Sequence, residues 1–206
     1  GDLREKLSIA NLLAATIDAF DRVDILVNAT THAPLCEDEA TDEAALATLF
    51  SQLVTVPMRL SQAVVKRMQH QAETRPRDEE AGAIVNICTL AARRTLPHLL
   101  PYSVAAAAQE QLTRSQAVDL APTRIRVNGV ALGGVITPSL RECMRNDDTL
   151  SDRLIAATPL GRIGEADEAA EAALFLASPG ASFITGQILT VDGGRSIIDR
   201  LDQPAS

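Results

Sequence analysis

Tyr102 is the only tyrosine of this 206-residue chain, and the residues spaced around it could support acid–base chemistry. Thr89 lies 13 residues before it, and Ala106 lies four residues after it, about one turn of a helix. A free tyrosine has a pKa near ~10, so at neutral pH its phenol is a poor base unless a nearby cation lowers that value. Ala106 supplies no cation. Structural explanations compete with a chemical one, because Tyr102 could be a packed aromatic side chain at a helix start and Thr89 an ordinary strand end.

Other reactive side chains form no recognisable site. Cys36, Cys88 and Cys143 are scattered without metal-ligand spacing, so we expect no metal site and three reduced thiols, as in cytoplasmic proteins. Cys88 is expected to be a small core residue rather than a nucleophile. Arg93 and Arg94 could hold an anionic group, but solvated surface side chains are the better interpretation.

The composition predicts one α/β domain over residues 1–206. Hydrophobic residues make up 46% and aromatic residues 2% of the chain, so Ala, Leu, Ile and Val must form the core. The formal net charge of −8 argues against nucleic-acid binding, which needs a basic face, and against docking on anionic membranes. No apolar run approaches the ~20 residues that a membrane-spanning helix needs, and no signal peptide is present. We therefore expect a cytoplasmic protein.

Hydrophobic periodicity predicts alternating strands and helices. Helices are expected at residues 4–20, 42–71, 102–120 and 165–177, the second with a bend near Pro57. Strands are expected at residues 24–28, 83–88, 125–130 and 187–191. Residues 31–41 and 72–81 are expected to be surface loops, and residues 139–160 loop with irregular helix. Strands that alternate with helices predict a parallel sheet with helices on both faces.

Four segments give the chain a resemblance to the short-chain dehydrogenase/reductase family over its whole length. The most specific are residues 159–168 (PLGRIGEADE) and 182–194 (SFITGQILTVDGG), which are close to the family's usual closing sequence. Residues 125–138 (IRVNGVALGGVITP) are similar to the strand and loop under the nicotinamide, and residues 24–29 (DILVNA) to the end of an earlier strand. The resemblance implies a Rossmann-like, doubly wound parallel sheet.

The resemblance also implies a catalytic set of four residues, two of which are changed here. The family's tyrosine falls on Tyr102, and its serine falls on Thr89, which keeps a hydroxyl to hold the substrate carbonyl. The family's lysine falls on Ala106 and its helix asparagine on Leu53. Ala106 can neither lower the tyrosine pKa nor hold the nicotinamide ribose, and Leu53 offers no side-chain hydrogen bond. Positioned acid–base groups are typically worth ~10²–10⁴ in rate, so an unaided Tyr102 should be severely slowed.

NAD or NADP is the cofactor that the resemblance implies. The cofactor-binding residues that it implies are Asp2, Asn28, Gly133, Val135 and Thr137. The family's Gly-rich phosphate turn belongs upstream of Asp2, and no segment of this chain supplies one. Glycines are needed there so that backbone N–H groups can approach the pyrophosphate. We therefore expect the chain as given to bind the cofactor weakly or not at all, and the choice between NAD and NADP stays open.

The N-terminal strands of the family's sheet are, by the same resemblance, missing from this sequence. The strand at residues 24–28 would then be an apolar edge, and such edges invite aggregation. Three explanations are open. A preceding segment could be absent from the given sequence, the protein could be truncated and compensated by a partner, or residues 29–45 could cover the edge. The lack of a starting methionine favours the first explanation.

Two functions from different classes fit these residues. The preferred hypothesis is a catalytically impaired or inactive family member that acts as a subunit of a homo-oligomer, or of a hetero-oligomer with an active paralogue. The helices at residues 42–71 and 102–120 would form the interface, where the small side chains of residues 105–108 would permit close packing. The alternative is an active NAD(P)-dependent oxidoreductase that interconverts a hydroxyl and a carbonyl, with Tyr102 as acid/base and Thr89 orienting the oxygen. A small-molecule binding module in the family's substrate cleft is a third possibility.

Overall fold

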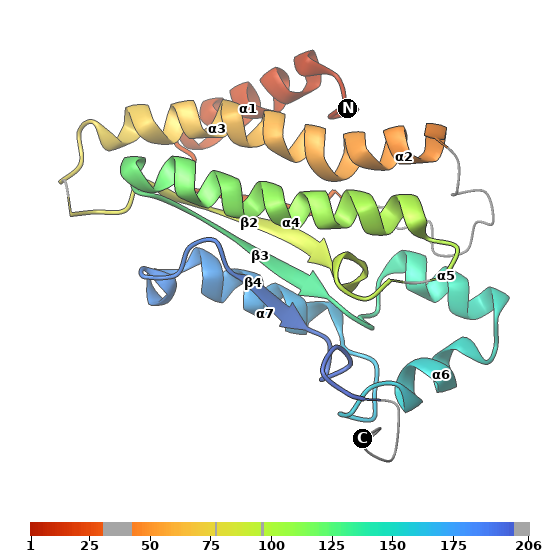
Figure 1. Ribbon diagram of the computed structural model, residues 1–206. Helices are drawn as coiled ribbons and strands as arrows, with labels where there is room; N and C mark the ends of the chain where they lie inside the picture. Colours follow the sequence, from red (N-terminus) through yellow and green to blue (C-terminus); the bar gives the residue numbers. More distant parts are fainter. Residues whose placement is uncertain (31–42, 77, 96, 200–206) are drawn as a thin grey trace.

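The computed structural model describes residues 1–30, 43–76, 78–95 and 97–199, and these fold into a parallel sheet covered by helices on both faces (Figure 1). The strands lie side by side in chain order, and each neighbouring pair is parallel. They confirm the expected strands to within two residues, and with them the Rossmann-like α/β fold. The strands are β1 (Ile25–Asn28), β2 (Gly82–Thr89), β3 (Ile125–Leu132) and β4 (Ile188–Val191).

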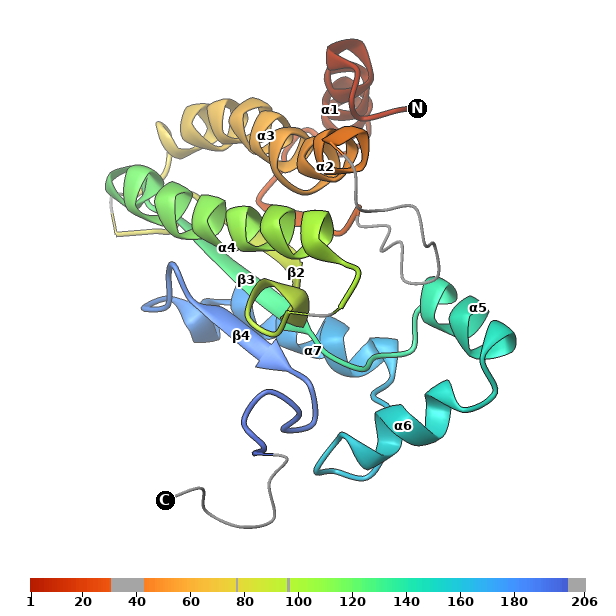
Figure 2. The same cartoon turned by 45° about the vertical axis from the view of Figure 1, so that its right-hand side comes forward.

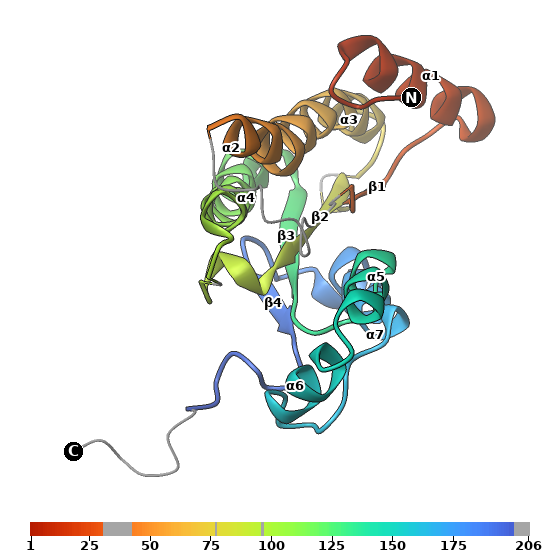
Figure 3. The ribbon, with the colours of Figure 1, turned by 90° about the vertical axis from the view of Figure 1, so that its right-hand side faces the viewer.

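One helical layer covers the sheet on the side of Tyr102, and a second lies on the opposite face (Figures 1 and 3). The first layer holds α1 (Lys6–Phe20), α3 (Val56–Ala72) and α4 (Leu100–Leu120), and the second holds α7 (Ala166–Ala177). Side chains alternate between the two faces of a strand, which explains how β2 supports both layers. Ile84 packs in the cluster beneath α3 and α4, whereas its neighbour Val85 packs against Leu176 of α7.

The long helix expected at residues 42–71 is divided by a π-helical segment; Asp42 lies outside the described residues. Pro57 has no N–H to donate to the Leu53 carbonyl four residues earlier, so a regular α-helix cannot close there. The structure places a wider turn where we expected a bend. Its parts are α2 (Glu43–Phe50), the π-helical segment η1 (Ser51–Thr55) and α3.

Two regular helices occupy most of residues 139–160, so the expectation of loop with irregular helix is wrong for that part of the segment. Figure 2 shows both helices beyond the carboxyl ends of the strands. The side chain of Thr137 accepts a hydrogen bond from the Leu140 N–H at 3.1 Å, and Pro138 follows in the first turn. This start signal outweighs the polar composition of the segment. The helices are α5 (Pro138–Asn146) and α6 (Leu150–Ala156).

β1 is an edge strand among the described residues, as we expected. Its side chains Ile25 and Val27 are 48% and 44% exposed. An edge strand presents unpaired N–H and C=O groups together with these apolar side chains, which makes it a template for further pairing. Most of the segment at residues 29–45, which we considered as a cover for this edge, lies outside the described residues.

Arg126, on β3, connects the segment before β2 to the end of α7 through one buried guanidinium. It pairs with Glu80 at 2.8 Å and donates to the Leu176 carbonyl at 2.7 Å. It also donates to the Ser178 carbonyl at 3.2 Å, so it satisfies two carbonyls at the end of α7.

We predict that Arg126→Met lowers the free energy of unfolding by about 3 kcal/mol, because removing one partner of a buried pair leaves the other charge uncompensated. Glu80 is 31% exposed, which places the loss at the low end of the usual range. Arg162→Met is the matched control, since its exposed pair with Glu168 should contribute little to stability. Denaturant unfolding measures both variants, and equal losses would contradict this role of Arg126.

Candidate active site

Three of the candidate residues lie where the parallel strands end. Asn28 is the last residue of β1, and Thr89, the last of β2, pairs in register with Leu132, the last of β3. Gly133 follows directly. In open parallel sheets, ligands bind at this carboxyl edge, next to the loops that lead into helices. The sheet register therefore gathers these residues at one edge.

Tyr102 and Thr89 are brought together from different elements. Tyr102 lies in the first turn of α4 and is 3% exposed. The side chain of Thr89, at the end of β2, forms a hydrogen bond with the Tyr102 side chain. The Thr89 hydroxyl also accepts a hydrogen bond from the Ala91 N–H at 3.3 Å, which caps the short helix η2 (Leu90–Ala92). The pairing of a phenol and a hydroxyl that the sequence pattern indicated is present in the structure.

Apolar side chains surround the Tyr102 ring. Leu53, from the π-helical segment, and Ala106, one turn beyond Tyr102, are both buried. Neither position offers a charge or a side-chain hydrogen bond to the phenol. The buried cluster that holds the ring consists of Leu49, Leu53, Ala91, Leu99, Tyr102 and Ala105.

Burial raises the pKa of the Tyr102 phenol above its ordinary value, because the phenolate would lose its hydration. The hydrogen bond from Thr89 acts in the opposite direction and lowers the pKa, and the neighbouring Cys88 adds a smaller increase. The net direction is upward. At neutral pH the phenol is therefore protonated, which suits a proton donor better than a base.

The two cysteines that the structure describes differ in bonding. Cys88 is a free, buried thiol, and burial, followed by the charge of Glu110, raises its pKa to about 12. Such a thiol is inert at neutral pH, which agrees with the expected core role. Cys143 is disulfide-bonded, so the expectation of three reduced thiols is wrong for that residue. Cys36 lies outside the described residues.

Arg93 and Arg94 are exposed, as expected for surface side chains, and both also contact protein groups. Arg93 Nε lies 2.9 Å from Glu110 Oε1, and Arg93 Nη1 donates to the Thr190 hydroxyl at 3.2 Å. Arg94 donates to the Ser196 carbonyl. Both side chains thus connect the segment that follows β2 to other parts of the fold.

Asp2 has a carboxylate that is already paired. Arg4 donates to both of its oxygens at 2.6 to 3.0 Å, and these hydrogen bonds lower the Asp2 pKa to about 2. A cavity of about 350 Å³ adjoins this pair and reaches Thr30, after β1, and Gln52. Because both oxygens are engaged, Asp2 fits a nucleotide hydroxyl poorly in this arrangement.

Asn28 belongs to a buried polar network that joins two strands to two helices. Its amide donates to Asn86 Oδ1 at 2.7 Å and to the Ser61 hydroxyl at 3.4 Å. The Asn86 amide donates to the Thr113 hydroxyl at 2.9 Å. Buried polar groups of this kind need such partners, so the network gives Asn28 a structural role, and its contact with a cofactor stays a prediction.

Gly133 and Thr137 also have structural roles. A Cβ at Gly133 would lie 2.4 Å from the Asp192 Cβ, so the close approach of β3 and β4 requires glycine there. Thr137 caps α5, as described above. Asp192 accepts hydrogen bonds from the Gly194 and Ser196 N–H groups, as expected for a turn residue.

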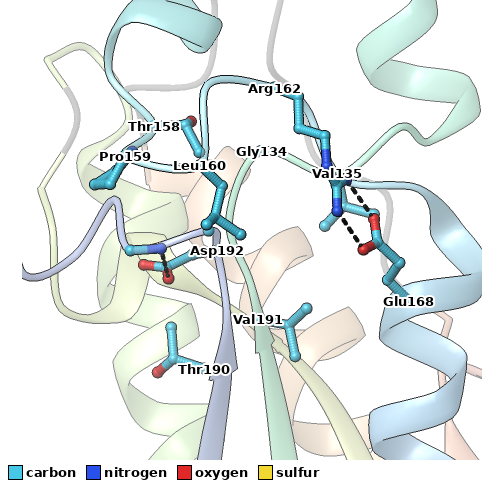
Figure 4. A pocket seen from close by; sticks show the side chains of 13 residues that line it. Gly134, Val135, Thr158, Pro159, Leu160, Arg162, Glu168, Thr190, Val191 and Asp192 are labelled. Atoms are coloured by element: carbon cyan, nitrogen blue, oxygen red, sulfur yellow. Dashed lines mark hydrogen bonds and ion pairs between the residues drawn. The ribbon is translucent and has the colours of Figure 1, made fainter.

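A cavity of about 420 Å³ lies at the ends of β3 and β4 (Figure 4). Val135 contributes to its wall, together with Thr190 and Asp192. Figure 4 shows Arg162 and Glu168 paired beside it, with two contacts of 2.7 Å. Of the expected cofactor residues, only Val135 lines this cavity, and Asp2 lines the other one; the structure does not bring all five together in one cavity.

Two buried residues near the site were not singled out from the sequence. Asn86 interrupts the apolar run of β2, and a polar residue inside a buried strand is a signal that could have been used. Glu110 left no such signal, because a glutamate in an Ala-rich helix normally faces water. Its burial depends on Arg93 and Arg114, which come from distant and neighbouring turns.

Neither a metal cluster nor a membrane helix occurs in the part of the chain that the structure describes. No three His, Cys, Asp or Glu side chains are grouped so that they could hold a metal ion there. No helix there is long and apolar enough to cross a membrane.

The parallel sheet, with Thr89 and Tyr102 at its carboxyl edge, places the chain among the Rossmann-like α/β proteins. A sequence model for the family described as Enoyl-(Acyl carrier protein) reductase matches residues 1–196. The chain belongs to the short-chain dehydrogenase/reductase family.

Similar proteins include dehydrogenases of several substrates. The 7alpha-hydroxysteroid dehydrogenase of Escherichia coli is 30% identical over 94% of this chain and 71% of its own length. The galactitol 2-dehydrogenase of Cereibacter sphaeroides is 36% identical over 89% of this chain and 70% of its own.

Solved structures agree with this assignment. A 7 alpha-hydroxysteroid dehydrogenase complexed with NADH and 7-oxo glycochenodeoxycholic acid has a TM-score of 0.81 at 31% identity, over 94% of this chain and 71% of that one. A gluconate 5-dehydrogenase from Burkholderia cenocepacia, in complex with NADP and tartrate, has a TM-score of 0.81 at 30% identity, over 97% and 74%. The first of these two structures thus contains NADH and the second contains NADP.

We predict that Tyr102 ionises above pH 10, its ordinary value, and that Thr89→Ala raises this pKa further because the hydrogen bond that lowers it is lost. Because the folded pKa exceeds the unfolded one, the linked stability is intact below pH 10 and is lost as the pH rises through the folded pKa. Phenolate absorbance reports this site alone, since the chain has one tyrosine and no tryptophan. A midpoint at or below 10, or a decrease in Thr89→Ala, would contradict the assignment.

Proposed function

We propose that this chain is a catalytically impaired oxidoreductase of the short-chain dehydrogenase/reductase family, acting as a subunit of an oligomer. One observation carries the proposal: Tyr102 is buried among apolar side chains, and its pKa is raised rather than lowered. A tyrosine that must take a proton near neutral pH needs a lowered pKa. No cation contributes to the pKa shift of Tyr102.

Leu53 and Ala106, the two positions that differ from the family pattern, both leave the Tyr102 pKa high. Leu53 packs in the same cluster as the Tyr102 ring and strengthens the desolvation of the phenol. Ala106 is buried one helical turn from Tyr102 and carries no charge. Leu53 and Ala106 thus do more than lack a hydrogen bond and a charge, because they make the space between α2 and α4 part of the apolar core.

Weak binding of NAD or NADP is part of this proposal. Its support is the pairing of Asp2 with Arg4, which engages the carboxylate that would meet the nucleotide, and the structural hydrogen bonds of Asn28. Calorimetric titration of the purified chain with NAD(H) and NADP(H) tests it. Tight binding at stoichiometric sites would contradict it.

The alternative is an active NAD(P)-dependent oxidoreductase that interconverts a hydroxyl and a carbonyl. The hydrogen bond between Thr89 and Tyr102 favours it, as do relatives that are named dehydrogenases. In the reducing direction, a nicotinamide cofactor supplies the hydride. The protonated Tyr102 would donate its proton to the carbonyl oxygen, while Thr89 orients that oxygen. The raised pKa keeps the phenol protonated at neutral pH, as a donor must be, but it makes the phenol a weaker acid and leaves little phenolate for the reverse direction.

We predict that Ala106→Lys combined with Leu53→Asn raises turnover of a panel of ketones and secondary alcohols by at least about 10²-fold, the usual contribution of positioned acid–base groups. Ala107→Lys is the matched control, since it adds the same charge to the exposed side of α4. Steady-state assays with both nicotinamide cofactors measure the effect. A wild-type turnover that is already measurable and does not change in the double variant would favour the alternative.

We also propose that residues 42–71 and 102–120 form the interface of a homo-oligomer, or of a hetero-oligomer with an active paralogue. Exposed apolar side chains on α4 support it, namely Leu100, Val104 and Val118. The expected role of residues 105–108 needs correction, because Ala105 and Ala106 are buried within the chain itself. A cytoplasmic location likewise stays a proposal, and the disulfide at Cys143 is an argument against it.

We predict that Val104→Glu weakens self-association at least tenfold, because it places a charge on the apolar face of α4. Leu7→Glu, on the exposed face of α1, is the matched control. Sedimentation velocity over a range of protein concentrations measures both. Equal behaviour of the two variants, or a monomeric wild type, would exclude the homo-oligomer through α4.

A further inference from the structure

We propose that Arg93 is a positioning residue that holds Thr89 against Tyr102 by tying the segment after β2 to α4 and β4. The proposal rests on the assignment of Thr89 and Tyr102 as the site, but not on whether that site turns over substrate.

The guanidinium of Arg93 bridges two elements. Its Nε lies 2.9 Å from Glu110 Oε1 on α4, and its Nη1 donates to the Thr190 hydroxyl on β4 at 3.2 Å. The fork of a guanidinium has fixed donor directions, so two such contacts restrict where the Arg93 backbone can lie. Arg93 is therefore held in place relative to both α4 and β4.

Arg93 is linked to Thr89 through a single short turn. The Thr89 hydroxyl caps the N-terminus of η2, and the Arg93 N–H donates to the Leu90 carbonyl at 2.9 Å at its C-terminus. A turn closed at both ends moves as a unit. Fixing Arg93 therefore fixes the direction of the Thr89 side chain.

Glu110 provides the fixed point on the helix that carries Tyr102. It lies eight residues after Tyr102, about two helical turns away, and its side chain is 5% exposed. Arg114, one turn further on, also pairs with it, at 2.7 Å. A buried carboxylate is costly unless it is paired, so Glu110 draws Arg93 towards α4. The ion pair thus sets the distance between the two segments that present the phenol and the hydroxyl.

A direct electrostatic effect of Arg93 on the phenol is not the basis of this proposal. The shift in the Tyr102 pKa arises from burial, Thr89 and Cys88, and Arg93 does not contribute to it. An effect of Arg93 on Tyr102 must therefore pass through the position of Thr89. This requirement distinguishes positioning from a simple charge effect.

The test uses the single tyrosine of the 206-residue chain as a reporter, labelled with ¹³C at Cζ, at neutral pH. The Cζ chemical shift responds to hydrogen bonding at the phenol oxygen. We expect Arg93→Met to move the resonance in the same direction as Thr89→Ala does. In the Thr89→Ala background, Arg93→Met should cause no further change, because coupled residues are not additive. Arg93→Lys, which retains a cation for Glu110 but loses the directed fork, should restore only part of the wild-type shift.

Arg114→Met is the matched control, because it removes the other guanidinium from the same carboxylate without touching the segment of Thr89. It should leave the Tyr102 resonance at its wild-type position. If Arg93→Met does not fold, as judged by circular dichroism, Arg93→Gln takes its place.

An unchanged resonance in Arg93→Met, or equal changes in the wild-type and Thr89→Ala backgrounds, would overturn the proposal. So would an Arg114→Met variant that behaves like Arg93→Met. None of these outcomes depends on turnover, so the proposed impairment of the enzyme could fail while the role of Arg93 stands, and the reverse is also true.

Discussion

The parallel register between β2 and β3 is the constraint on which the rest of the structure depends. Eight successive residue pairs, from Gly82 with Ile125 to Thr89 with Leu132, fix where each strand ends. Because both strands end together, the turn that carries Thr89 and the loop that follows Leu132 start at the same edge. α4 crosses the sheet next to them and brings Tyr102 to that edge, so strand alignment positions the residues of the site.

Much of the fold was predictable because its signals are local. Apolar runs such as residues 83–88 and 125–130 define buried strands, and the Thr89 to Tyr102 spacing indicated two residues that the structure does pair. The two helices at residues 138–156 were missed although Thr137 and Pro138 mark a helix start. That error came from weighing composition above capping, which is the more specific signal.

The remaining features depend on contacts between distant residues, which periodicity cannot show. Glu110 and Arg93 are 17 positions apart, and each looks like an ordinary surface charge until the chain folds. The disulfide bond of Cys143 likewise depends on a contact that periodicity cannot show. The π-helical segment at residues 51–55 follows from Pro57, but the sequence alone did not distinguish a wider turn from a bend.

The hydrogen-bond network of Asn28, Asn86 and Thr113 fixes the alignment of the strands independently of the candidate site. It lies on the same sheet as the site, yet it shares no hydrogen bond with Thr89 or Tyr102 among those described. A slip of β2 against β1 would separate its amides, so the network selects one alignment from a strand of otherwise interchangeable apolar residues. The alignment of the sheet is thus stabilised by residues other than Thr89 and Tyr102. Leu53 and Ala106 lie outside this network, so the strand alignment does not depend on the side chains at those two positions.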